Sequence, residues 1–159
     1  MARSLETSID IEAPPQDVWA VLLDLPAYGD WNPFIVAAEG TAEPGERLTL
    51  RMQVAGKSFT LRPTVHTRTE AQVLRWRGSV GVRGLFDGEH VHELQPIPTG
   101  TRYVQRERFT GVLLPLMART VDATERAFGQ MNLALKQRAE ARTAPPASPP
   151  PADQPPTPV

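Results

Sequence analysis

The chain has 159 residues, of which 40% are hydrophobic, and this length suits one compact domain. Its 17 lysines and arginines against 18 aspartates and glutamates give a net charge of -1, which argues against a nucleic-acid partner. The sequence contains no cysteine, which excludes disulfides and a thiolate nucleophile and suits a reducing compartment.

Neither export nor membrane spanning is expected from the sequence. Residues 1–11 include charged side chains and no apolar run of the kind that a signal peptide needs. No apolar run approaches the roughly 18 residues of a membrane-spanning helix. We therefore expect a cytoplasmic, soluble protein without stable membrane insertion.

The amino-terminal part is predicted to form one strand and two short helices. Residues 4–12 alternate between apolar and polar side chains, which is typical of a half-buried strand. Two consecutive prolines then favour the first turn of a helix that ends before Pro26. Residues 27–33 are rich in helix breakers and aromatics, and they predict a short helical turn or loop anchored by Trp31.

Six further strands are expected to follow as an antiparallel meander. Turn-forming pairs such as Pro44-Gly45 and Ala55-Gly56 separate the early strands. The strands are predicted at residues 34–39, 47–54, 58–67, 73–78, 86–95 and 101–110. Between the fourth and fifth of these, the glycine-rich residues 78–84 predict a mobile rim rather than a phosphate-binding loop.

A long amphipathic helix is predicted over residues 113–141, opened by Pro115. Its buried stripe repeats at alternating steps of three and four residues, at Leu114, Met117, Val121, Thr124, Phe128, Met131 and Leu135. At about 1.5 Å per residue the helix spans roughly 40 Å, enough to cross a small sheet. The sheet is expected to wrap around it.

The last residues, 142–159, are predicted to form a disordered Pro-rich tail outside a domain at 1–141. Prolines alternate there with alanine, serine and threonine, and no aromatic side chain is available for burial. Two interpretations remain open for this tail. It presents a polyproline II ligand to a protein partner, or it is a solvated extension without a role.

Several short motifs occur in order along the predicted elements, namely Ile9-Asp10-Ile11-Glu12-Ala13-Pro14, Val18-Trp19, Trp31-Asn32-Pro33-Phe34, Leu74-Arg75-Trp76-Arg77-Gly78, Gly88-Glu89-His90 and Glu107-Arg108-Phe109-Thr110-Gly111. With these motifs, the element order resembles the helix-grip fold of the START and Bet v 1-like superfamily, often labelled SRPBCC, over residues 3–140. That resemblance implies an α+β fold in which a curved antiparallel sheet of about seven strands wraps a long carboxy-terminal helix, with two short helices after the first strand. Its polyketide cyclase/dehydrase-related branch is the most similar.

The resemblance implies a hydrophobic cavity between the curved sheet and the final helix. Different relatives use such cavities for lipids, aromatic polyketides, plant hormones or other apolar molecules. Members range from carriers to cyclases to partners of other proteins, so the fold does not imply one reaction. It supplies no universal catalytic motif, and we expect no cofactor and no metal.

Polar and large apolar side chains share one face of each of the last two strands. These faces carry Phe86, Gly88, His90, His92 and Leu94 on the first, and Tyr103, Gln105, Glu107 and Phe109 on the second. Burying such polar groups without partners costs about 1 to 3 kcal/mol each. The pattern therefore favours a hydrated or ligand-filled cavity over a dry core.

His90, His92 and Glu107 are the candidate catalytic residues, because an acid/base set of this kind can enolise or dehydrate a carbonyl substrate. A metal site built from the same three groups lacks a clear fourth ligand, and no metal is expected. In the other interpretation the histidines bond to Glu107, Gln105 or water and only polarise a ligand pocket.

The candidate ligand-binding residues combine this polar set with apolar side chains that suit a flat or chain-like molecule. They are Trp31, Met52, Phe59, Trp76, Phe86, His90, His92, Tyr103, Gln105, Glu107, Phe109, Met117, Thr120, Thr124 and Phe128. We expect the protein to bind, transport or sequester an apolar or amphipathic small molecule such as a lipid or polyketide, without a cofactor. The alternatives are a polyketide cyclase/dehydratase-like enzyme and a non-catalytic protein-interaction module.

Overall fold

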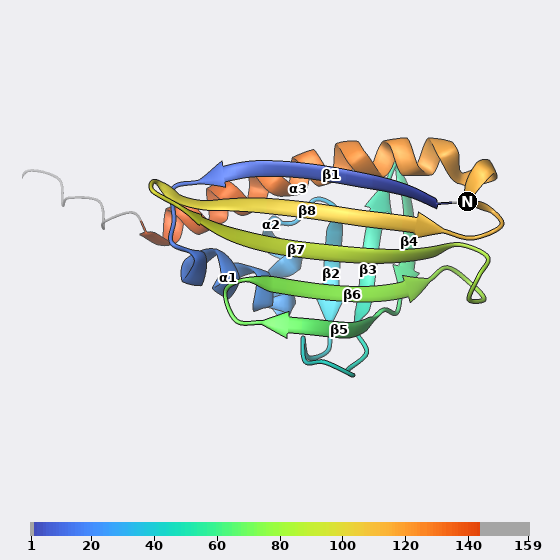
Figure 1. Cartoon of the computed structure of the whole chain (residues 1–159), viewed down its shortest axis with the longest axis horizontal. Helices are drawn as coiled ribbons and strands as arrows, with labels where there is room; N and C mark the ends of the chain where they lie inside the picture. Colours follow the sequence, from blue (N-terminus) through green and yellow to red (C-terminus); the bar gives the residue numbers. More distant parts are fainter. Residues whose placement is uncertain (1, 144–159) are drawn as a thin grey trace, which may run out of the picture.

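The computed structural model of the protein describes residues 2–143. Two antiparallel sheets and one long helix enclose the core, and the larger sheet curves along that helix (Figure 1). The larger sheet has the strand order β1-β8-β7-β6-β5, and the smaller one has the order β2-β3-β4. The predicted α+β helix-grip fold is confirmed. The predicted Pro-rich tail lies outside the described residues, apart from two residues at the end of the last helix.

The strands and helices follow one another along the chain with short connections. The strands are β1 (Ala2–Ile11), β2 (Ile35–Glu39), β3 (Thr49–Val54), β4 (Lys57–Leu61), β5 (Thr64–Thr69), β6 (Val73–Ser79), β7 (Asp87–Ile97) and β8 (Gly100–Thr110). The helices are α1 (Pro15–Leu23), η1 (Leu25–Ala27), α2 (Tyr28–Trp31), η2 (Leu114–Met117) and α3 (Ala118–Thr143). None of these helices combines the length and the apolar character that crossing a membrane would require.

The described residues form eight strands, one more than the sequence predicts, because the expected strand 58–67 is two strands. Pro63 separates them: proline has no N–H to donate to a sheet, so a continuous strand is disfavoured there. β4 pairs with β3 in the smaller sheet, and β5 pairs with β6 in the larger one. The chain therefore changes sheets at Pro63, and a seam separates the edge strand β4 from the end of β6, where Gly78 and Ser79 extend beyond the pairing with β5.

The long helix α3 packs against β1 and α1 and buries the predicted stripe from Val121 onward, whereas Met117, in the turn before it, is half-buried. Val121, Phe128, Met131 and Leu135 are fully buried. The predicted opening at Pro115 is a 3-10 turn, η2, and the α-helix begins only at Ala118. Proline fits an opening turn because the first N–H groups of a helix have no intrahelical partner.

The two predicted short helices are present after β1, and α2 is a single turn. Tyr28 is fully buried, and its hydroxyl donates a hydrogen bond to the carbonyl of Leu22 at 2.7 Å. Trp31 is half-buried and packs edge-on against Tyr28, with 5.2 Å between the ring centroids. Tyr28 is therefore the deeper anchor of this segment, beside the predicted anchor Trp31.

Candidate functional site

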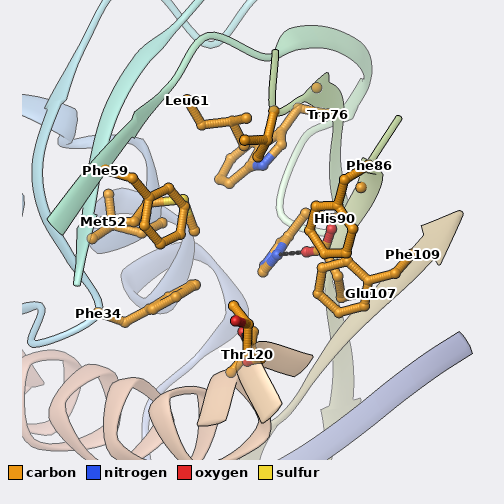
Figure 2. A pocket seen from close by; sticks show the side chains of 15 residues that line it. Phe34, Met52, Phe59, Leu61, Trp76, Phe86, His90, Glu107, Phe109 and Thr120 are labelled. Atoms are coloured by element: carbon orange, nitrogen blue, oxygen red, sulfur yellow. Dashed lines mark hydrogen bonds and ion pairs between the residues drawn. The ribbon is translucent and has the colours of Figure 1, made fainter. Parts of the chain in front are cut away.

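A largely apolar pocket lies between the smaller sheet, strands β6 to β8 and the beginning of α3. Its free volume is about 50 Å³. Figure 2 shows aromatic and aliphatic side chains surrounding this space from several sides, with Thr120 on the helix below them. The lining residues are Phe34, Ile35, Met52, Phe59, Leu61, Trp76, Gly78, Val80, Phe86, Gly88, His90, Glu107, Phe109, Thr120 and Thr124.

One buried pair of titratable groups, His90 and Glu107, interrupts the apolar wall. The two residues face each other across β7 and β8, and Nδ1 of His90 lies 2.5 Å from Oε2 of Glu107 (Figure 2). His90 is 2% exposed and Glu107 is 8% exposed. Trp76 stacks on the imidazole of His90 with 5.2 Å between ring centroids. Aromatic packing therefore holds the His90 ring in place in addition to its contact with Glu107. A histidine and a carboxylate in contact can hold or relay a proton at this wall.

Gly88 leaves the space that the Glu107 side chain occupies. A Cβ atom at position 88 would lie 2.3 Å from Oε1 of Glu107, well inside van der Waals contact. Gly88 faces Phe109 in the register of β7 and β8, two pairs along from the His90 and Glu107 pair and therefore on the same face. The glycine therefore allows a carboxylate to sit against the strand at the pocket wall.

His92 is directed toward a different partner from the one expected. Its Nδ1 lies 2.5 Å from the hydroxyl of Tyr103, and both residues are fully buried. Burial, together with the neighbouring charge of His90, lowers the pKa of His92 well below 6.5. Burial likewise raises the pKa of the Tyr103 hydroxyl well above its ordinary value. Both groups are therefore neutral near pH 7.

Three buried polar atoms beside this region have no hydrogen-bond partner among residues 2–143: Nε2 of His90, Nε2 of His92 and Oε1 of Gln105. Gln105 uses its amide nitrogen to contact the sulfur of Met131 on α3 at 3.3 Å. A buried polar atom without a partner costs about 1 to 3 kcal/mol. Because His90 lines the pocket, its free ring nitrogen is the group that a ligand's polar atom would satisfy.

The structure brings part of the predicted ligand set to the pocket. Nine of the predicted residues line it: Met52, Phe59, Trp76, Phe86, His90, Glu107, Phe109, Thr120 and Thr124. Six others do not: Trp31, His92, Tyr103, Gln105, Met117 and Phe128. Phe128 is core and contacts the ring of His90 edge-on at 5.1 Å between centroids. The predicted catalytic set therefore separates into the His90–Glu107 pair and His92, whose ring still lies 4.4 Å from that of His90.

Six lining residues were absent from the predicted set: Phe34, Ile35, Leu61, Gly78, Val80 and Gly88. Two of them could have been found by alternation, since Gly88 shares the face of His90 and Leu61 shares that of Phe59. Phe34 and Ile35 come from the connection into β2, and no periodic signal indicates their contribution. Gly78 lines the pocket where β6 approaches Leu61 and Pro63, and this contact depends on the change of sheet.

Residues 80–86 lead from β6 to β7 and are hydrogen-bonded to residues 111–113; Val80 and Phe86 of this loop line the pocket. The backbone N–H of Val112 donates to Gly84 at 3.1 Å, and that of Leu113 donates to Leu85 at 2.9 Å. Hydrogen bonds from Ser79 and from the backbone of Gly84 hold the pKa of Asp87 below its usual value, and Arg77 and Arg83 lower it further. Hydrogen bonds therefore hold the end of this loop at Gly84 and Leu85, and the mobility expected for residues 78–84 stays a prediction.

No group of three or more histidine, aspartate or glutamate side chains within residues 2–143 is arranged to hold a metal ion. The pocket offers hydrogen bonding and proton transfer through His90 and Glu107, together with apolar contact.

Comparison with known proteins identifies one family over almost the whole described chain. A family model described as "Polyketide cyclase / dehydrase and lipid transport" matches residues 2–140. No curated protein matches the sequence.

Several solved structures are similar in fold at low sequence identity. The Zhui aromatase/cyclase from Streptomyces sp. R1128 is 20% identical with a TM-score of 0.75, and the match covers 91% of this chain and 97% of that one. Ara h 8.0201 is 15% identical with a TM-score of 0.69, covering 89% of this chain and 99% of that one. The di-domain ARO/CYC StfQ from the steffimycin biosynthetic pathway is 13% identical with a TM-score of 0.74, covering 90% of this chain and 52% of that one. At these identities the likeness shows the fold alone.

Proposed function

This chain belongs to the polyketide cyclase/dehydrase and lipid transport family, and on that premise we propose that it binds an apolar or amphipathic small molecule, such as a lipid or a polyketide, in the pocket of Figure 2. The observation that carries the proposal is an apolar wall with one buried polar pair, His90 and Glu107. Small-molecule sites typically combine a mostly apolar lining with a few polar groups that fix orientation. Burial of apolar ligand surface would supply the affinity, and the polar pair would select one ligand group.

The pocket must widen to hold such a ligand. Its free volume of about 50 Å³ is small beside the roughly 300 to 1,000 Å³ of common ligand sites. The seam between β4 and β6 is the place where widening costs least, because β4 is an edge strand that pairs only with β3. Phe59 and Leu61 of β4 line the pocket there and are only half-buried. Outward movement of this strand would open the pocket without breaking the larger sheet.

An NMR titration of the 15N-labelled protein tests the proposal. Fatty acids, sterol-like compounds, flavonoids and aromatic polyketides are each added while the backbone amides and the indole N–H of Trp76 are followed. We expect saturable shifts at Trp76, Phe59 and His90 with at least one class of compound. Absence of saturable shifts at these positions with every class would overturn the proposal.

Two variants sharpen this titration. Thr120 lines the pocket from α3, so Thr120→Phe fills the free volume and is expected to abolish the saturable shifts. Gln137 is exposed on the same helix outside the pocket, so Gln137→Phe adds the same group where no ligand binds. Loss of binding in both variants would point to a general defect, and the pocket assignment would fail.

A second candidate function is a cyclase or dehydratase, and the buried His90–Glu107 contact favours it. In such a reaction the pair would accept the proton from the carbon beside a substrate carbonyl and return it to a departing hydroxyl, which leaves as water. The deciding assay is turnover of poly-β-ketone mimics by the protein and by Glu107→Gln. An enzyme would lose turnover in this variant while ligand binding largely survives; equal turnover in both proteins would exclude the catalytic role.

A further inference from the structure

A second concave surface lies on the outer side of the seam between β4 and β6. We call it the basic groove; Arg47, Arg62, Arg77 and Arg83 line it together with His66. Its free volume is about 740 Å³, and its remaining lining residues are threonine, serine and glycine. No carboxylate lines it among residues 2–143. Four guanidinium groups around one hollow make an environment suited to an anion.

None of the four groove arginines forms an ion pair within residues 2–143, whereas four other arginines, Arg3, Arg68, Arg102 and Arg106, do. Elsewhere, Arg102 pairs with Asp10 at 2.8 Å, and Arg106 pairs with both Glu6 and Glu93. Groove charge is offset in part, because Asp87 lies near Arg77 and Arg83, and Glu89 faces Arg77 across β6 and β7. Four positive charges against these two negative ones still leave the groove positive. Because the net charge of the whole chain is -1, this concentration of positive charge is confined to the groove.

The groove and the pocket are the outer and inner sides of one seam. On β4, Phe59 and Leu61 line the pocket, while Thr60 and the following Arg62 line the groove. On β6 the same alternation puts Trp76 inside and Arg77 outside. Gly78 lines both, and a Cβ atom there would lie 3.2 Å from Leu61 and Pro63. A chain entering the pocket through this seam would leave its other end at the groove.

We propose that the basic groove binds the anionic, phosphate-bearing end of an amphipathic ligand whose apolar part occupies the pocket; this rests on the function proposed above. Arginine suits a phosphate because its planar fork donates two parallel hydrogen bonds to two oxygens. Threonine hydroxyls at Thr60 and Thr64 supply further donors beside the guanidinium groups. The ligand class is therefore a phosphate ester of an apolar chain or ring.

Calorimetric titration with two probes of equal chain length tests the proposal. Dodecyl phosphate and dodecanol are titrated below their aggregation concentrations into the full chain. We expect dodecyl phosphate to bind about tenfold more tightly at low salt, and we expect added salt to reduce the difference. The double variant Arg62→Ala/Arg83→Ala should bring the two affinities together without altering that for dodecanol. Arg138 is exposed near the end of α3, so Arg138→Ala is the matched control and should leave the difference intact.

The outcomes separate this proposal from the one on which it rests. Equal affinity of the two probes for the unmodified protein would overturn the groove assignment and leave the pocket standing. Binding of inorganic pyrophosphate that Arg62→Ala/Arg83→Ala removes, with neither dodecyl probe bound, would support the anion site and overturn the pocket. Vesicles of phosphatidylglycerol and phosphatidylcholine separate the two sources of phosphate. Retention on the anionic vesicles alone, without binding of monomeric dodecyl phosphate, would overturn a single-ligand site in favour of a membrane surface.

Discussion

Nδ1 of His90 lies 2.5 Å from Oε2 of Glu107, and the two residues occupy facing positions on β7 and β8. Both side chains are buried at the wall of the pocket, and Trp76 covers the imidazole. A change in either residue therefore alters the hydrogen bonding of the other. This coupling makes the pair the most informative place to begin mutagenesis.

Replacing Glu107 by alanine should destabilise the protein by about 1 to 3 kcal/mol, because Nδ1 of His90 loses its partner inside a buried site. Glu107→Gln should cost less, since the amide keeps an acceptor near the ring. Urea unfolding at pH 7 measures both free energies. Glu89 directly precedes His90 on β7 and therefore lies on the opposite face of the sheet, and Glu89→Ala should change stability by no more than about 0.5 kcal/mol. Equal losses in Glu107→Ala and Glu89→Ala would contradict the coupling.

Stability should fall as the pH drops below about 6.5, because the pKa of His92 is well below that value in the folded protein. Below the pKa that His92 has in the unfolded chain, the unfolded chain binds a proton at this residue and the folded chain does not. The contribution of His92 is therefore fully present above about pH 6.5 and declines by up to about 1.4 kcal/mol per pH unit below it. Urea unfolding between about pH 7 and pH 5 measures this slope.

His92→Asn should flatten the pH dependence of stability, whatever it does to stability itself, because asparagine can bond to Tyr103 without titrating. The matched control is His66→Asn, since His66 is exposed on β5. If stability depends on pH equally steeply in His92→Asn and in the unmodified protein, His92 is not the source of that dependence. Carboxylates with lowered pKa values, such as Asp10 and Glu140, also lose stabilising interactions in acid, but they do so below their unfolded pKa values of 3.8 and 4.5.

Gly88→Ala should disturb the site more than the fold. The new Cβ would lie 2.3 Å from Oε1 of Glu107, and the side chain of Glu107 must move to accommodate it. We expect changed ring resonances of His90 in NMR spectra and weaker ligand binding. Gly129→Ala provides the contrast, because nothing lies within 4 Å of its Cβ position inside α3. That variant should leave the His90 resonances unchanged and stabilise the protein by about 0.5 to 1 kcal/mol; unaltered His90 resonances in Gly88→Ala would contradict the steric argument.

The hydroxyl of Thr124 should contribute little to ligand binding, because it already donates to the carbonyl of Thr120 at 2.9 Å. Thr124→Val keeps the shape of the side chain and should leave the affinity for dodecanol within about twofold. Thr124→Ser keeps the hydroxyl but removes a methyl group from the lining, and it should weaken binding by about fourfold. Calorimetric titration measures the affinity of both variants for dodecanol. If Thr124→Val weakens binding more than Thr124→Ser does, the hydroxyl contacts the ligand.

The periodicity of the sequence predicts which side chains share a face of a strand, but it does not predict which part of that face lies at the pocket and which part packs against α3. His90 and His92 share a face, as alternation requires, yet only His90 reaches the pocket. The difference arises from packing, because Tyr103 occupies the region beside His92, and Met131 of α3 contacts Gln105. Which part of a face is covered depends on where a distant helix crosses it. No local pattern contains that information.

The stripe on the last helix was predicted well because one period governs it over many residues. Val121, Phe128 and Leu135 are fully buried at their predicted steps. The number of strands was predicted less well, since residues 58–67 contain one continuous apolar alternation. Pro63 was the signal for two strands, because a proline within such a run disfavours its continuation. That single break also creates the seam on which both proposed binding regions depend.

The pairing of β1 with β8 has a consequence for the order of folding. Glu6 and Arg106 form an ion pair across these strands although 100 residues separate them in the chain. During synthesis at about 5 to 20 residues per second, β1 therefore waits roughly 5 to 20 seconds for its described partner strand to be made. The hairpins β2–β3, β6–β7 and β7–β8 can form earlier from local segments. Closure of the sheet by its first strand is thus a late event, and the nascent chain carries an unpaired edge until then.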